Sequence, residues 1–83
     1  MVSLFLKFTD YPCRDVKRAL SALGFRFIAQ KGSHEQWEKI ENGIKRKVTV
    51  DCHGGVVKAK DVRSIIAQAG VSKSDFLKVI GKN

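Results

Sequence analysis

The sequence is poor in the residues that build disulfide frameworks and metal sites. Its 83 residues include only two cysteines, two histidines and one proline. Two cysteines are too few for a disulfide framework. The spacing of Cys13, Cys52, His34 and His53 matches no zinc-binding pattern. We therefore expect free thiols, no metal site and no cofactor.

Long apolar runs are also missing. The apolar start of the chain, residues 2–8, is far too short to cross a bilayer, although it could add an edge strand to the fold. It also lacks the charged leader and the cleavage site of a signal peptide. We expect a cytoplasmic protein with no membrane partner. A chain of 83 residues has room for one modest core, so we expect a single domain over residues 1–83.

Positive charge is present in excess. Sixteen lysines and arginines against eight acidic residues give a net charge of +8. Such an excess attracts a polyanion, so nucleic acid is the first partner to consider. The alternative is a basic surface that serves only solubility. The charge is spread along the chain without a basic tail, so any binding surface must be assembled by the fold.

Three helices are predicted from the spacing of apolar residues. The first lies between Pro12 and Gly24, and the second covers residues 60–69. Each is followed by a glycine, which is typical of a helix C-terminus. Ser72 followed by Asp75 is a capping-box pattern that begins a short third helix.

Between the first two helices the pattern changes to that of strands. Residues 25–31, 34–40 and 45–52 carry β-branched and aromatic side chains, and Asn42-Gly43 is a strong hairpin signal. The order predicts an α+β fold: a helix, a three-stranded antiparallel sheet, a helix and a short C-terminal helix, with the helices on one face of the sheet. The first strand is ambiguous because its apolar residues alternate onto both faces.

Alternation along the strands places one histidine on the open face of the sheet. We take Trp37, Val48 and Val50 to point toward the helices, which makes Trp37 a core residue rather than a base-stacking one. His34 and Lys47 then point outward, into solvent.

His34 is the candidate catalytic residue. An imidazole both takes and gives a proton near neutral pH. Cleavage of RNA needs a base for the 2′-hydroxyl and positive charge for the developing phosphorane, while the substrate supplies its own nucleophile. The candidate phosphate-binding cations are Lys31, Lys45, Arg46 and Lys47. A purely structural role in the turn or on the surface is the alternative for His34.

Three neighbouring residues are candidate substrate contacts: Gly32, Ser33 and His53. Gly32 provides a turn that lets substrate approach. Ser33 positions either His34 or the phosphate, or serves only the turn. His53 is a second acid–base group, a substrate contact or a residue that stabilises its own loop.

The order of these motifs resembles the HicA toxins of HicAB toxin–antitoxin systems. The resemblance extends over residues 14–80 and rests on Gly24-Phe25, Gly32-Ser33-His34, Val48-Thr49-Val50 followed by His53, Asp61–Ala69 with Gly70, and Ser72 with Phe76-Leu77. It implies a double-stranded-RNA-binding-domain-like α-β-β-β-α fold and a ribosome-independent mRNA endonuclease. The catalytic histidine of the family matches His34, and a HicB antitoxin inhibits the toxin.

Two features depart from the family pattern. Residues 1–10 precede the point at which members often begin, and they are an added strand, a dimer edge or a misplaced start. Where members often carry proline, this chain has Asp51 and Cys52, and an acidic Asp51 could weaken contact with RNA.

We expect a metal-independent endoribonuclease toxin that cleaves single-stranded mRNA to a cyclic phosphate and a 5′-hydroxyl end. We also expect a HicB-like antitoxin to cover the His34 face. One alternative is a non-catalytic RNA-binding module of the same fold. Another is an interaction protein whose N-terminal strand pairs with the edge of a partner's sheet.

Overall fold

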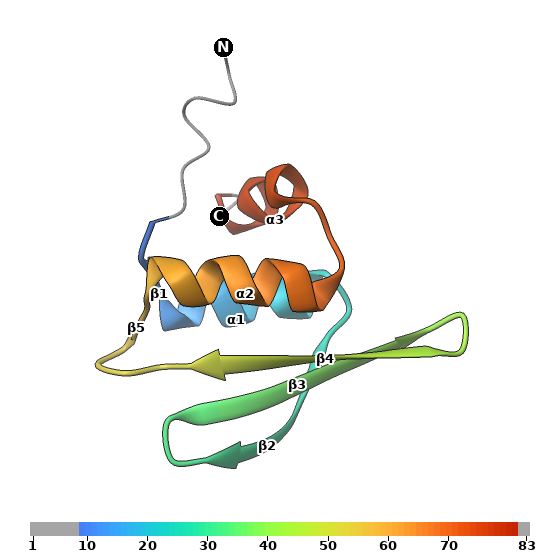
Figure 1. Cartoon of the computed structure of the whole chain (residues 1–83), viewed down its shortest axis with the longest axis horizontal. Coiled ribbons are helices and arrows are strands. Elements are labelled where there is room, and N and C mark those ends of the chain that lie inside the picture. The colour runs from blue at the N-terminus through green and yellow to red at the C-terminus, as the bar shows by residue number, and fades with distance from the viewer. Residues whose placement is uncertain (1–8, 82–83) are drawn as a thin grey trace.

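The computed structural model describes residues 9–81, which form three helices and two β-sheets (Figure 1). In chain order the elements are β1 (Tyr11–Pro12), α1 (Cys13–Ala22), β2 (Arg26–Lys31), β3 (His34–Glu41), β4 (Ile44–Asp51), β5 (Val56–Val57), α2 (Ala59–Ala69) and α3 (Lys73–Ile80). The α+β fold and its α-β-β-β-α order are confirmed, as is the short C-terminal helix. The possible strand at residues 2–8 lies outside the described residues.

The helices begin and end close to where the sequence predicts. Gly70 follows α2 in the left-handed conformation, with φ of +74°, which lets the chain leave the helix axis. Ser72 precedes α3, and its Oγ accepts a hydrogen bond of 3.0 Å from the backbone N–H of Asp75. This is the N-terminal cap that the capping-box pattern indicates.

Strands β2, β3 and β4 form the predicted antiparallel sheet. Asn42 and Gly43 connect β3 to β4, and both have positive φ, as the tightest hairpin turns require. This two-residue turn sets the register of the hairpin, so that His34 at the start of β3 lies opposite Asp51 at the end of β4. The turn therefore determines which residue faces the candidate histidine.

The ambiguity of the first strand is explained by a β-bulge at Ile28. Phe27 pairs with Trp37 and Ala29 pairs with Gln36, which leaves Ile28 as the extra residue. The alternation of side chains shifts by one residue at this point. Phe27 and Ile28 therefore break the simple alternation of apolar residues, because Ile28 is the extra residue of the bulge.

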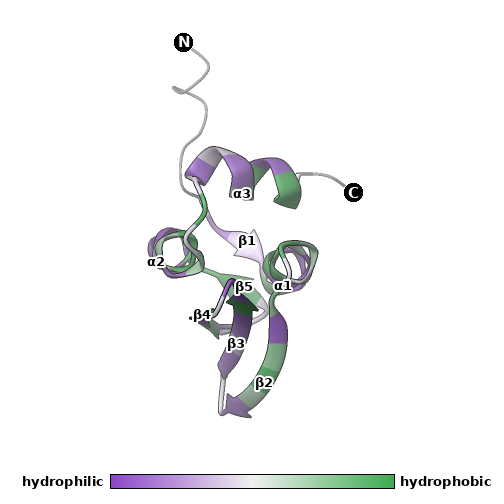
Figure 2. Cartoon of the chain, turned by 90° about the vertical axis from the view of Figure 1, so that its right-hand side faces the viewer, coloured by the Kyte–Doolittle hydropathy of each residue, from purple (hydrophilic) through white to green (hydrophobic). Residues whose placement is uncertain are grey.

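Helices α1 and α2 lie side by side over one face of the sheet, and α3 lies across them on the side away from the sheet (Figure 2). The largest fully buried side chains are Phe76, Leu20, Ile65, Val16, Val48, Val50, Val57 and Val62. Trp37 is also buried among the core residues, as predicted. Within the part of the chain that the structure describes, no helix is long and apolar enough to cross a membrane.

The expectation of free thiols is wrong. Cys13 and Cys52 form a disulfide bond, with Cα atoms 5.6 Å apart. The fold brings the start of α1 beside the residue that follows β4, and this Cα separation is within the usual range for disulfides. The two cysteines are separated by 39 positions in the sequence, so no local pattern indicates the pairing.

A small second sheet, absent from the sequence prediction, joins β1 to β5. Tyr11 pairs with Val57 and Pro12 pairs with Val56. The backbone N–H of Cys13 also donates to the carbonyl of Gly55 at 2.8 Å. Two-residue strands are too short to show a period, which is why the sequence does not reveal them. Together these contacts fix the loop that follows β4 against the start of α1.

Candidate active site

His34 is the first residue of β3 and follows a tight turn at Gly32 and Ser33. Gly32 has φ of +59°, and a β-carbon at this position would meet no neighbouring group within 4 Å. The tip of the turn is therefore open to an approaching molecule. His34 pairs with Lys31 on β2 and with Asp51 on β4, so three side chains of one sheet face lie in a single row.

Asp51 lies between two histidines. Its Oδ2 is 3.6 Å from Nε2 of His34, and its Oδ1 is 3.5 Å from Nε2 of His53. A protonated imidazole on either side would form an ion pair with it at these distances. The Asp51 side chain is 25% exposed, whereas the side chains of His34 and His53 are 55% and 74% exposed. The carboxylate thus sits below two imidazoles that are accessible to a substrate.

Ser33 completes the cluster, because its hydroxyl contacts both Asp51 and His53. Its Oγ donates a hydrogen bond of 2.8 Å to Asp51 Oδ1 and lies 3.3 Å from Nε2 of His53. An ionised carboxylate only accepts hydrogen bonds, so the single hydroxyl hydrogen is used by Asp51. Ser33 can then only accept from His53, which requires a hydrogen on Nε2 of that ring. In a neutral His53, Nδ1 is the unprotonated nitrogen.

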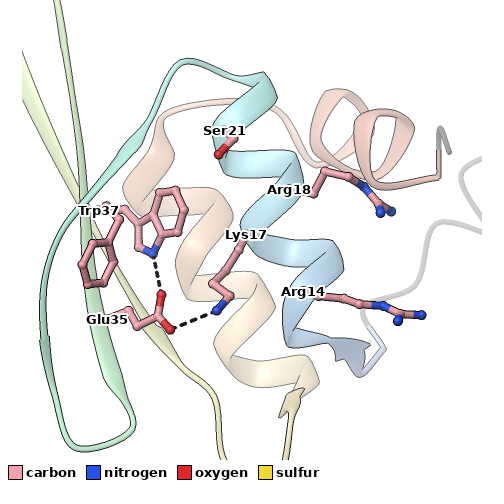
Figure 3. A pocket seen from close by; sticks show the side chains of 7 residues that line it. Arg14, Lys17, Arg18, Ser21, Glu35 and Trp37 are labelled. Carbon is pink, nitrogen blue, oxygen red and sulfur yellow. Dashed lines mark hydrogen bonds and ion pairs between the residues drawn. The ribbon is translucent and has the colours of Figure 1, made fainter.

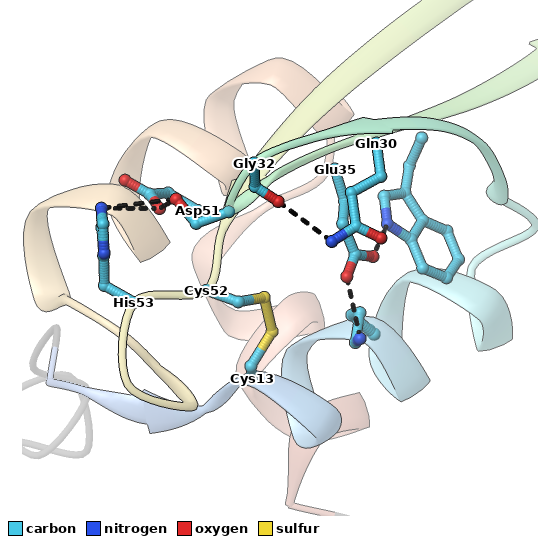
Figure 4. Close-up of a disulfide and its surroundings, with 10 residues drawn as sticks. Cys13, Gln30, Gly32, Glu35, Asp51, Cys52 and His53 are labelled. Carbon is cyan, nitrogen blue, oxygen red and sulfur yellow. Dashed lines mark hydrogen bonds and ion pairs between the residues drawn. A yellow bond between two sulfur atoms is a disulfide. The ribbon is translucent and has the colours of Figure 1, made fainter.

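The loop that carries His53 is held beside the Gly32-Ser33 turn (Figure 4). The backbone N–H of Cys52 donates to the carbonyl of Ser33 at 3.0 Å, and the disulfide attaches Cys52 to α1. Val56 N–H donates to the carbonyl of His53 at 3.1 Å. The first two bonds join segments that are distant in the sequence and the third closes the loop itself, so together they hold the loop of His53 beside the turn.

A hollow of about 230 Å³ opens beside His34, between the sheet and α2. It is lined by His34, Thr49 and Asp51 of the sheet and by Asp61, Ser64 and Gln68 of α2. The backbone N–H of Thr49 donates to Gln68 Oε1 at 2.9 Å, which attaches the edge strand β4 to α2. With Asp51 and Asp61 on its walls, the hollow repels a phosphate group. A phosphate near His34 is therefore expected on the side of Lys31.

The structure separates the candidate phosphate-binding cations. Lys31 lies directly opposite His34. Lys47 is on the same face but about 13 Å along β4 from the row of His34, at about 3.3 Å per residue. Lys45 is farther still, and its Nζ lies 3.7 Å from Glu38 Oε1. Lys31 is thus the candidate cation beside the histidines, and the other two extend along the same face.

Arg46 lies on the opposite side of the sheet from His34. Neighbouring residues of a strand point to opposite faces, so Arg46 points toward the helices while Lys45 and Lys47 do not. Its guanidinium packs against Gly70 at the end of α2, where an added β-carbon would come within 2.5 Å of it. The structure does not bring Arg46 into the cluster around His34.

Sequence reasoning placed His34, Ser33 and His53 at the site but missed the role of Asp51 as their shared partner. The signal was present in the hairpin: a two-residue turn at Asn42-Gly43 places residue 51 opposite residue 34. Two imidazoles and a carboxylate can accept and donate protons on one substrate. Among residues 9–81, no group of three or more His, Cys, Asp or Glu side chains is arranged to hold a metal ion.

The fold and this cluster define a small basic α+β protein with a histidine–aspartate cluster on the open face of its sheet. The family model of the HicA toxin of bacterial toxin–antitoxin systems matches residues 13–71. The chain therefore belongs to the HicA toxin family, which supports a role as a toxin paired with an antitoxin. No curated protein matches the chain.

Proposed function

We propose that this toxin is an endoribonuclease that cleaves mRNA by general acid–base catalysis, with His34 as its central catalytic residue. The observation that carries the proposal is the position of Asp51 between His34 and His53 on an exposed sheet face. Lys31 lies beside this cluster, where it can neutralise a phosphate. Acid–base groups and a cation are the two requirements of RNA cleavage through the 2′-hydroxyl.

The proposed reaction uses the nucleophile that RNA itself carries. One imidazole accepts the proton of the 2′-hydroxyl while the 2′-oxygen bonds to phosphorus. The other imidazole donates a proton to the 5′-oxygen while the bond from that oxygen to phosphorus breaks. The products are a 2′,3′-cyclic phosphate and a 5′-hydroxyl end. Because both proton transfers are made by side chains, the proposed reaction is independent of metal ions and of the ribosome.

The contacts of the two rings indicate which nitrogen would serve. Asp51 faces Nε2 of His34, which leaves Nδ1 of that ring for the substrate. In the same way Ser33 and Asp51 face Nε2 of His53 and leave its Nδ1. We assign one proton transfer to each histidine, with Asp51 and Ser33 as positioning residues.

The neighbouring residues would orient the substrate. Lys31 binds the scissile phosphate, and the open Gly32-Ser33 turn admits the ribose–phosphate backbone close to His34. Lys47 and Lys45, farther along the same face, bind flanking phosphates. The net charge of +8 favours the approach of a polyanion such as single-stranded mRNA in the cytoplasm.

The proposed partner is a HicB-like antitoxin that covers the His34 face. Covering this face would block both imidazoles at once, and an acidic antitoxin surface would complement the basic toxin. Membership in the toxin family supports a pairing of this kind. The antitoxin should therefore protect RNA from the toxin, and replacing Lys31 by glutamate should weaken the complex.

The ends of the cleaved RNA test the mechanism. Purified protein incubated with a long single-stranded RNA is expected to leave 5′-hydroxyl ends and 2′,3′-cyclic phosphates. Ends that carry a 5′-phosphate would overturn the proposed attack by the 2′-oxygen. If the protein binds RNA with a steep dependence on salt but cleaves none, it is a non-catalytic RNA-binding module of the same fold.

A further inference from the structure

A second recessed surface lies on the helix side of the sheet, between α1 and the sheet strands β2 and β3. This groove, of about 460 Å³, is lined by Arg14, Lys17, Arg18, Ser21, Phe27, Glu35 and Trp37 (Figure 3). It shares no lining residue with the hollow beside His34. The groove is therefore a separate feature that the proposed reaction does not use.

One wall of the groove is aromatic. The rings of Phe27 and Trp37 meet edge to face, with centroids 6.0 Å apart and planes at 79°. Trp37 is buried, but Phe27 is 49% exposed although it is a large apolar residue on an edge strand. An exposed aromatic ring offers a stacking surface to any nucleobase, because every base has a flat π-face.

A buried carboxylate holds this wall in place. Glu35 Oε1 accepts a hydrogen bond from Trp37 Nε1 at 3.1 Å, and Glu35 Oε2 accepts one from Lys17 Nζ at 3.0 Å (Figure 3). These two bonds fix the indole ring and attach α1 to β3. The groove is thus formed before a ligand arrives, which lowers the entropy cost of binding.

The rim of the groove is cationic. Three of its lining residues carry positive charge, and Glu35 is the only lining carboxylate. The arginine heads extend from α1 away from the aromatic pair (Figure 3). Asp15 lies 3.7 Å from Arg14 Nε and 3.1 Å from an amino nitrogen of Arg18. All three cations belong to α1, so a ligand with a flat apolar part and negative charge along one side fits this arrangement.

We propose that this groove binds one unstacked nucleotide of single-stranded RNA, with the base on Phe27 and the flanking phosphates on Arg14 and Arg18. This inference rests on the proposed function, because it names a second contact for the same substrate. An RNA chain that crosses the edge strand β2 passes from the groove to the His34 face. Phe27 and Lys31 lie opposite Trp37 and His34, which are three residues apart on β3, so the two positions are separated by about 10 Å at ~3.3 Å per residue.

The groove would also discriminate between single-stranded and double-stranded RNA. A base inside a duplex is paired and stacked on its neighbours, so it cannot insert between α1 and Phe27. A base in a single strand is free to stack on an aromatic side chain. The proposed contact therefore favours single-stranded over double-stranded RNA, without a hydrogen bond that reads the base.

Binding of an uncleavable RNA tests this site. The probe is a short single-stranded RNA with 2′-O-methyl groups throughout, which has no 2′-hydroxyl to attack the phosphate, and its affinity is measured by fluorescence anisotropy. Phe27→Ala is expected to weaken binding by roughly 5- to 150-fold, the range found when one stacking residue is truncated. Phe27→Tyr, which keeps the ring, should bind as the wild type does.

Charge is tested separately on the rim. Arg14→Ala should weaken binding and reduce the slope of log K against log salt by about 0.7, as expected for one lost phosphate contact to a single strand. Two control variants remove matched side chains outside the groove. Ile44→Ala truncates another exposed apolar residue, and Lys78→Ala removes an exposed charge on α3. Both controls should bind the probe with wild-type affinity.

Each outcome decides between the alternatives. If folded Phe27→Ala, checked by its melting temperature, binds the probe as tightly as the wild type, the groove proposal is wrong even where the protein cleaves RNA. If Phe27→Ala loses the antitoxin but keeps its RNA affinity, the groove is a protein interface and the proposal is also wrong. If the wild type binds the probe through Phe27 but cleaves no natural RNA, the groove proposal stands and the proposed endoribonuclease function fails.

Discussion

Replacing Asp51 by asparagine tests whether this carboxylate organises the two histidines. The substitution keeps the shape of the side chain and an oxygen that can accept from Ser33, but it removes the charge that faces both rings. An ion pair at 3.5–3.6 Å between partly exposed groups contributes about 1 kcal/mol. In the proposed reaction one imidazole gains a proton while the other loses one, so only the pair with the proton-accepting histidine forms during the reaction. Its loss removes about 1 kcal/mol of stabilisation from the transition state, or roughly 5-fold in rate.

The measurement is kcat/KM for cleavage of a single-stranded RNA by Asp51→Asn, beside the wild type. Asp61→Asn is the matched control, because it removes the same charge from the facing wall of the hollow. That variant should cleave at least as well as the wild type, since the repulsion of phosphate is lower. Urea titrations of both variants should give free energies of unfolding within about 1 kcal/mol of the wild type.

Equal rates for the two aspartate variants would refute the reasoning. Asp51 would then act only as one negative charge near the substrate and not as the partner of the histidines. A lower rate accompanied by a large loss in the free energy of unfolding would also refute the reasoning. Asp51 would then be needed to hold the Gly32-Ser33 turn and not to pair with the histidines.

Three further predictions concern stability and binding. Replacing Cys13 by serine, or reducing the bond to Cys52, should lower the free energy of unfolding by about 4 kcal/mol in urea titrations, as expected for a loop of this length. Two reactive thiols in the untreated native protein would contradict the bond itself. Ser72→Ala should cost about 1 kcal/mol in the same titrations because the cap of α3 is lost, and an unchanged midpoint would contradict it. Lys31→Ala should raise KM for RNA and reduce the salt slope by about 0.7, whereas Lys78→Ala should change neither.

The main elements follow from local signals in the sequence. Asn42-Gly43 predicts the hairpin, and the structure confirms it with positive φ at both residues. Ser72 and Asp75 predict the start of α3 in the same way. These features depend on a few neighbouring residues, so the sequence contains the information that determines them.

Features that depend on distant pairings could not be predicted. The bulge at Ile28 is visible only when β2 is paired with β3, and the bond between Cys13 and Cys52 depends on where α1 lies against β4. Arg46 is different, because alternation along its own strand already places it on the face opposite Lys47. Arg46 was included among the candidate phosphate-binding residues because of its charge, although its position in the strand already indicated the opposite face.

The central claim is that His34 is the catalytic centre of a metal-independent ribonuclease. Its most direct test is cleavage of a long single-stranded RNA in EDTA by the purified wild type beside His34→Ala, with melting curves of both proteins. The account predicts that the variant loses roughly 10²–10⁴-fold in rate, while its free energy of unfolding changes by no more than about 0.5 kcal/mol. RNA that stays intact with the wild type, or that is cleaved equally by both proteins, would contradict it.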